Sequence, residues 1–165
     1  AYFGNVGVCL RALAYILRNG RDGLKRVTEC AVLNANYLKH QLKDVIEIEH
    51  SEGCLHEFVA TGRGWKNDFG VRTLDIAKRL LDYGMHAPTV YFPLIVHGAL
   101  MIEPTESESL EGLDRFVEAL LSIAEEAKQD PDWVRTAPHR TRLARLDETR
   151  AARKPVLRWQ PRSAP

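Results

Sequence analysis

The sequence of 165 residues lacks most of the features that mark special classes of protein. Its apolar runs, 90–96 and 99–102, fall far below the roughly 18 residues of a membrane-spanning helix. The N-terminus has no basic segment before an apolar one and no small-residue cleavage site, so no signal peptide is predicted. The first residue is not Met, which suggests a chain cut from a longer one. We therefore expect no membrane association and a cytoplasmic location.

Cysteine is also scarce, with only Cys9, Cys30 and Cys54. An odd number at wide spacing fits neither a disulfide framework nor a CxxC metal site, and it suits a reducing cytosol. Cys9 and Cys30 lie in helical patterns, and we interpret them as small buried hydrophobic residues.

Catalytic motifs are missing too. The sequence contains no HExxH, GxSxG, P-loop or GxGxxG pattern, and no two histidines have helical i, i+4 spacing, so we expect no metal. None of the seven lysines lies among small and apolar residues, as a Schiff-base lysine does. On motifs alone, the chain holds no complete active site and no catalytic residue.

What is present is an ordinary globular composition, 45% hydrophobic and 27% charged, with an uneven charge distribution. From Arg135 onward there are nine basic residues, Arg162 being the last, against Asp147 and Glu148. That leaves 14 basic and 20 acidic residues before Arg135, a net charge of −6 on the body and +7 on the tail. A basic tail of this kind requires an acidic surface to bind, either on the body of the same chain or on a second subunit.

A nucleic acid is the competing partner for this basic tail. We favour a protein partner and expect no nucleic acid, because apolar residues punctuate the arginines as in a segment that packs on protein: Leu143, Leu146, Val156, Leu157 and Trp159.

Hydrophobic periodicity predicts the skeleton. Spacings of three and four residues indicate a helix packed on one face over 6–17, ending at Gly20, and a longer amphipathic helix over 22–42. Alternation predicts strands at 45–49 and 56–61, with a loop at 62–64. A helix over 74–83, strands at 89–92 and 99–102, and a helix over 107–128 follow. Thr105 and Glu108 have capping-box spacing at the start of the last helix.

This order favours an α+β fold in which helices cover one side of a small, mostly antiparallel sheet. We divide the chain into a helical segment over 1–42, an α+β domain over 43–134 and a basic tail over 135–165.

Although catalytic motifs are missing, five longer segments resemble those of a known family. They are TECAVLNANYLKHQL (28–42), HEFV (56–59), VRTLDIAKRLLDYGMHAPTVYFPL (71–94), ALMIEPTESES (99–109) and LDETRAARKPVLRW (146–159). In this order they resemble the C-terminal part of the glycine-cleavage P-protein family, glycine dehydrogenase (decarboxylating). TVYFPLIV and ARKPVLRW are most similar to the second subunit of the bacterial two-subunit form.

The resemblance implies the C-terminal small domain of a fold-type I enzyme that uses pyridoxal phosphate. Such an enzyme releases the glycine carboxylate as carbon dioxide and passes the aminomethyl group to the lipoyl arm of the H-protein. The family's cofactor lysine lies in a large upstream domain, and no position here matches its motif. The chain alone is therefore expected to bind no cofactor covalently and to be inactive. Its implied partners are the large domain, the first subunit and the H-protein, in an oligomer.

Site residues follow from the same resemblance. Gly4 and Asn5, in the FGN segment (3–5), match a family segment whose backbone N–H groups are expected to meet the cofactor phosphate. The alternative is that Asn5 only caps the first helix. His86, Thr89 and Tyr91 match the HAPTVYF stretch that is expected to face the cofactor cleft, where a purely structural role is the alternative.

Met101 occupies the position at which many fold-type I enzymes have an arginine that clamps the substrate carboxylate. An enzyme that must lose this carboxylate gains nothing from a strong ground-state clamp, so an apolar residue in the substrate cleft makes chemical sense. We expect Glu103 to accept hydrogen bonds near the following helix start. Contact with the basic tail or with a lipoyl-bearing partner is the alternative.

His97, Gly98 and the loop GRGWKNDFG (62–70) depart from the family pattern, so no roles are transferred to them. A second functional class also stays open: a non-catalytic interaction module that binds an acidic partner, such as the H-protein, through the basic tail.

Overall fold

The computed structural model describes residues 4–50 and 52–159, so Phe3 and Arg162 lie outside the described part. Its elements are α1 (Val6–Leu42), β1 (Glu47–Ile48), β2 (Phe58–Thr61), α2 (Arg63–Phe69), α3 (Thr73–Asp82), β3 (Thr89–Val90), β4 (Ala99–Ile102), α4 (Leu110–Gln129), α5 (Pro131–Arg135) and α6 (Glu148–Arg153). Within the described residues no helix is long and apolar enough to cross a membrane.

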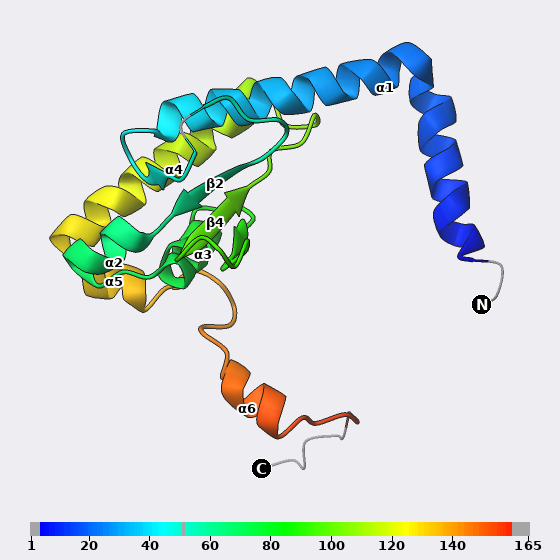
Figure 1. Ribbon diagram of the computed structural model, residues 1–165. Coiled ribbons are helices and arrows are strands. Elements are labelled where there is room, and N and C mark those ends of the chain that lie inside the picture. The colour runs from blue at the N-terminus through cyan, green and yellow to red at the C-terminus, as the bar shows by residue number, and fades with distance from the viewer. Residues whose placement is uncertain (1–3, 51, 160–165) are drawn as a thin grey trace.

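The four strands form one antiparallel sheet in the order β1-β2-β4-β3. Because side chains alternate along a strand, Phe58, Ala60, Leu100 and Ile102 share one face. That face is buried against α1, α3 and α4, which supply Leu42, Leu80, Leu120 and other core residues. Figure 1 shows the long helices α1 and α4 running together behind the strands. The predicted α+β arrangement is confirmed.

Helix α1 bends sharply at Gly20, whose φ of 64° and ψ of −176° interrupt the helical backbone. The predicted end of a first helix at this glycine is therefore confirmed, although the two halves form one bent element (Figure 1). The second half buries Ala35, Leu38 and Leu42. The expectation that the first half packs on one face was wrong for this structure, because its apolar side chains are exposed.

Three further expectations require correction. The start of α4 is capped by Ser109, whose hydroxyl accepts from the Gly112 N–H at 3.2 Å, and not by the predicted capping box that begins at Thr105. Cys9 is exposed on the uncovered half of α1 instead of buried. The predicted loop at 62–64 is the start of α2, which ends at Gly70 in the left-handed conformation.

Candidate functional site

Thr89 and Met101 are direct cross-strand neighbours on the face of the sheet opposite the core. Val59, on the other side of Met101, completes the row. Thr89 is exposed, whereas Val59 and Met101 are half-buried. The structure thus brings two of the predicted cleft residues together and adds Val59. The alternation within 56–61 contains the signal for Val59, since it places this residue opposite Phe58 and Ala60.

His86, also predicted for the cleft, borders a hollow of about 270 Å³ at the end of β4. The lining is mainly apolar and includes Leu38, Met85, Ile102 and Phe116, while the carboxylates of Glu103 and Glu108 add negative charge. Such a surface favours a ligand that combines an apolar body with a positive group. Periodicity could not reveal it, because its residues come from five separate parts of the chain: α1, the segment before β3, β4, the loop after β4, and α4.

Glu103 follows β4 directly and faces His56, which precedes β2. Its Oε1 lies 3.7 Å from His56 Nε2, and Glu57 Oε2 lies 4.0 Å from the same nitrogen. The expected hydrogen bonds of Glu103 near the start of α4 are not found among the described residues; the carboxylate instead pairs with a histidine across the sheet. Contact with a partner stays a prediction.

Ligand atoms of His56, Glu57 and Glu103 all lie within 4.8 Å of one another. An imidazole with two carboxylates is a donor set that divalent transition metals accept. However, His56 and Glu103 are exposed, and each pairs favourably with its neighbour when the histidine is protonated. The contacts among these three side chains explain the cluster without a bound ion, and the absence of a metal stays a prediction.

Tyr91 lies in a second hollow, of about 340 Å³, and does not border the hollow of His86. Its backbone has a φ of 60°, which is uncommon for a residue with a side chain, and its N–H donates to the Ala99 carbonyl at 2.8 Å. Basic side chains also line this hollow: Arg63, Lys66, Arg72 and His97. Sequence reasoning missed them because they come from segments far apart in the chain, and because the 62–70 segment and His97 depart from the family pattern.

The loop around Gly98 is fixed by two buried threonines. Thr61 Oγ1 donates to the His97 carbonyl at 2.6 Å, and Thr73 Oγ1 donates to the Gly98 carbonyl at 2.7 Å. Gly98 has a φ of 70°, which favours glycine, and a Cβ there would lie 3.2 Å from Thr73 Oγ1. The floor of the Tyr91 hollow is therefore rigidly held.

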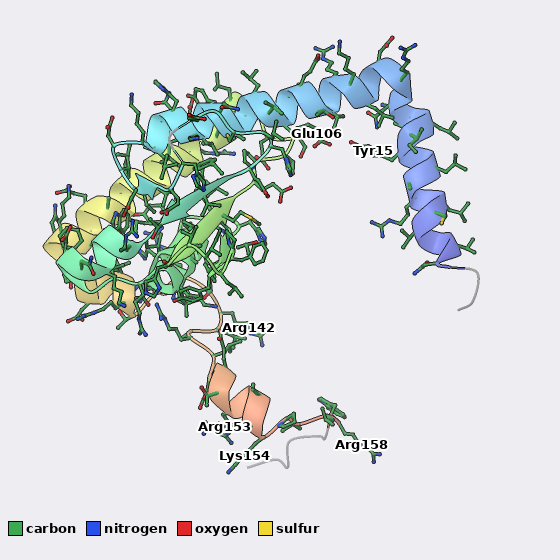
Figure 2. All side chains as sticks on the ribbon, in the orientation of Figure 1. Tyr15, Glu106, Arg142, Arg153, Lys154 and Arg158 are labelled. Carbon is green, nitrogen blue, oxygen red and sulfur yellow. The ribbon has the colours of Figure 1, made fainter. Side chains whose placement is uncertain are left out.

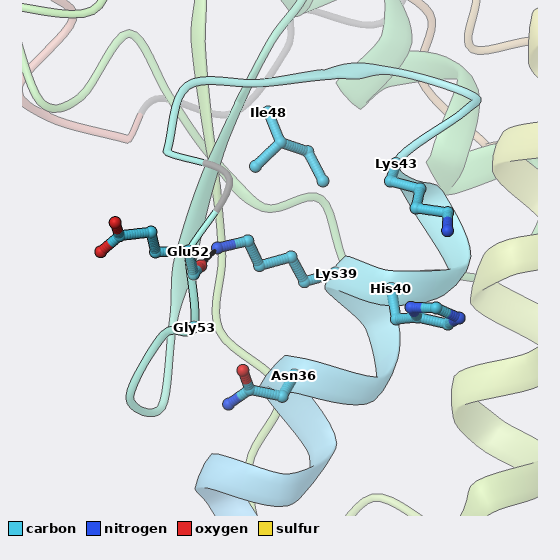
Figure 3. Close-up of a pocket in the computed structure, with 7 residues that line it drawn as sticks. All are labelled: Asn36, Lys39, His40, Lys43, Ile48, Glu52 and Gly53. Carbon is cyan, nitrogen blue, oxygen red and sulfur yellow. Dashed lines mark hydrogen bonds between the residues drawn. The ribbon is translucent and has the colours of Figure 1, made fainter.

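A third hollow, of about 420 Å³, lies at the C-terminal end of α1 and is drawn in Figure 3. Lys39, His40 and Lys43 surround it, but the buried Lys39 ammonium donates to the Glu52 carbonyl. Cations at a helix C-terminus compensate the partial negative charge of the last carbonyl groups. We therefore interpret this cluster as structural.

Gly4 and Asn5 directly precede α1, whose first half leads away from the sheet (Figure 1). The Asn5 side chain accepts from the Val8 N–H at 3.1 Å, so it caps the helix as the structural alternative requires. Gly4 has a φ of 85°. A phosphate contact of these two residues stays a prediction.

The family described as "Glycine dehydrogenase, C-terminal domain" matches residues 27–139. The chain is 54% identical to probable glycine dehydrogenase (decarboxylating) subunit 2 of Kosmotoga olearia over 98% of this chain and 34% of that relative. It is 59% identical to the same subunit of Staphylococcus haemolyticus over 96% of this chain and 32% of the relative. The chain therefore spans about a third of the length of the curated relatives that it matches.

Proposed function

Since this chain belongs to the family of glycine dehydrogenase C-terminal domains, we propose that it is the C-terminal part of subunit 2 of glycine dehydrogenase (decarboxylating). The parent enzyme would remove the carboxylate of glycine and pass the aminomethyl group to the lipoyl arm of an H-protein. Its partners would be the large upstream domain, the first subunit and the H-protein, in an oligomer. The three free cysteines agree with a cytoplasmic location, where thiols stay reduced.

The residues of this chain do not fit a covalently held pyridoxal phosphate. Among the residues that the structure describes, Lys39 is the only buried lysine, and its ammonium donates to the Glu52 backbone carbonyl. Lys66 borders the Tyr91 hollow but is exposed on α2. We therefore propose that the lysine that holds the cofactor belongs to the upstream domain, which accords with the small-domain role that we propose within the fold-type I class.

The role that we propose for this chain is to form one wall of the cofactor cleft. The row of Val59, Thr89 and Met101 offers a mostly apolar surface with one hydroxyl, and His86 borders the neighbouring hollow. A wall of this kind excludes water and leaves the substrate carboxylate without a cationic clamp, which favours its loss.

A single observation carries the proposal: the match spans nearly all of this chain but only a third of each relative. Borohydride reduction of the full-length subunit with pyridoxal phosphate, followed by peptide mapping, tests it. We expect one lysine upstream of this chain to be labelled in near-stoichiometric yield, and only scattered traces on the 165-residue chain alone.

Lys39→Arg in the full-length subunit is the matched control. It should leave the labelling unchanged, because the proposal gives Lys39 only a structural contact with the Glu52 carbonyl. Near-stoichiometric reduction at Lys39 or Lys66 would overturn the assignment, because the chain would then hold the cofactor itself.

A further inference from the structure

The beginning of the basic tail is tightly anchored to the body. The carboxylate of buried Asp82 accepts from the His139 N–H at 2.8 Å and from the Arg140 N–H at 2.6 Å. Arg145 Nη1 lies 2.7 Å from Oδ1 of buried Asp75, and Arg145 Nε donates to the Ala137 carbonyl at 2.7 Å. These contacts fix the point and the direction in which the following residues leave the body.

After Arg145 the chain leads away from the body, and we call residues 146–159 the C-terminal arm (Figures 1 and 2). Helix α6 of the arm has no buried residue. Val156, Leu157 and Trp159 are 89%, 87% and 86% exposed. Three large apolar side chains within four residues, on an anchored segment, form a contact surface that lacks its counterpart within the described residues.

The charges of the arm specify this counterpart. Four basic side chains, Arg150, Arg153, Lys154 and Arg158, outnumber two acidic ones, and Figure 2 shows Arg153, Lys154 and Arg158 reaching outward. Both acids lie at the start of α6, where the Asp147 carboxylate accepts from the Arg150 N–H at 2.8 Å. The acids thus serve the helix terminus, and the cations stay available for a surface that is apolar and acidic.

The first half of α1 indicates where this surface lies. Its apolar side chains are uncovered as well, with Leu10 60% and Leu17 74% exposed. In Figure 1 this half-helix and the arm both lead away from the body toward the lower side of the view. The relatives have about two-thirds of their length outside the match, and in the proposed function this length precedes the start of α1.

We propose that the C-terminal arm folds over the upstream domain of its own polypeptide and holds it against the body as a clasp. The inference rests on the proposed function, which supplies that domain. Val156, Leu157 and Trp159 enter an apolar groove of the domain, and Arg150, Arg153, Lys154 and Arg158 pair with acidic residues around it. The tether at α1 makes this contact intramolecular, so a short arm is sufficient.

Photo-crosslinking in the full-length subunit, assembled with its natural partners, tests the clasp. Benzoylphenylalanine replaces Leu157, and mass spectrometry identifies the peptide to which it attaches after irradiation. The same replacement of Leu121, an exposed residue of α4, is the matched control. We expect the Leu157 probe to mark a peptide of the upstream domain of the same polypeptide in at least tenfold higher yield than the control.

A crosslink to a second copy, to another subunit or to residues 27–139 would overturn the clasp, as would the absence of any crosslink. Mixing isotope-labelled and unlabelled subunits separates attachment within one polypeptide from attachment between copies. Glycine-dependent release of carbon dioxide by the unsubstituted protein is measured in parallel. An active enzyme without the upstream crosslink refutes only the clasp, whereas the crosslink in a protein that cannot decarboxylate glycine refutes only the proposed function.

Discussion

The hydroxyl of Tyr15 donates a 2.9 Å hydrogen bond to Oε1 of Glu106 across 91 positions of sequence. Tyr15 lies before the bend of α1 at Gly20, and Glu106 lies in the loop between β4 and α4 (Figure 2). The carboxylate stabilises the neutral phenol and raises the pKa of Tyr15, first through the hydrogen bond and then through partial desolvation and its charge. This contact links the uncovered half of α1 to the body.

Replacing Tyr15 by Phe should free the first half of α1 without unfolding the body. Spin labels at Cys9 and at a Ser122→Cys substitution, with Cys30 and Cys54 replaced by alanine, report the distance across the bend. We expect a broader distance distribution and a Tm within about 2 °C of the parent value, since an exposed contact contributes little to global stability. An unchanged distribution would show that the bend is held by other contacts; Tyr91→Phe is the matched control.

Asp82→Asn should strongly destabilise the body. Asp82 is buried and accepts hydrogen bonds from two backbone N–H groups and from Arg79 Nη1 at 2.7 Å. Within the described part of the chain, removal of its charge leaves Arg79 with Glu126 as its one anionic partner, and breaking a buried ion pair costs about 3–5 kcal/mol. Urea unfolding of the 165-residue chain measures the loss. Asp132→Asn, in the exposed pair with Arg135, is the control and should change the free energy by less than about 1 kcal/mol.

Stability should also fall in acid. Burial raises the pKa of Asp82, but hydrogen bonds from Arg140, Arg79 and His139 outweigh it and bring the pKa below the ordinary 3.8. Burial also raises the pKa of Glu126, but hydrogen bonds from Arg79 and Tyr83 outweigh it and bring this pKa below the ordinary 4.5. Both carboxylates therefore stabilise the fold above their ordinary pKa values, and this contribution is lost as the pH falls through the lowered values.

Urea unfolding at pH 7, 5.5, 4 and 3 measures this dependence. We expect an almost constant free energy between pH 7 and 5.5 and a decrease toward pH 4 and below. Asp82→Asn should show a shallower decrease, because one of the two titrating groups is gone. An equal decrease in both proteins would assign the acid sensitivity to other carboxylates.

Met101→Arg in the full-length enzyme tests the proposed cleft wall. Met101 is half-buried on the uncovered face of the sheet beside Thr89, so an arginine is accommodated without loss of the core. A charge-assisted hydrogen bond to the glycine carboxylate is worth about 1.5–3 kcal/mol. We expect kcat for decarboxylation to fall roughly 10- to 150-fold while KM decreases. Met101→Leu is the control, and unchanged or faster decarboxylation by the arginine variant would refute the argument.

Periodicity recovered the elements that form the core, because burial of one face imposes a regular spacing. The strand at 99–102 was predicted at the residues where it occurs, and the predicted end of a first helix at Gly20 coincides with the bend of α1. Helices α2, α5 and α6 were missed, since they are at most seven residues long and carry too few turns for a repeating pattern.

The site was harder to predict, for a physical reason. Thr89 and Met101 are neighbours because of the register between β3 and β4. An alternating sequence pattern helps to fix such a register, since it decides which residues share a face of the sheet. The approach of His56 to Glu103 depends on how far β2 and β4 extend, and that is set by the whole sheet. A sequence pattern shows that a helix face is apolar but not what covers it. The expected packing of the first half of α1 and the expected burial of Cys9 were wrong for this reason.

The bend at Gly20 makes the first half of α1 a lever. From Val6 to Gly20 this half-helix is about 21 Å long, at 1.5 Å per residue. A change of only 10° at the glycine moves the far end by roughly 4 Å on that geometry, which exceeds the length of a hydrogen bond. The backbone angles of Gly20 therefore determine where any domain joined at the start of the helix lies relative to the sheet. The hydrogen bond from the Tyr15 hydroxyl restricts rotation at this glycine.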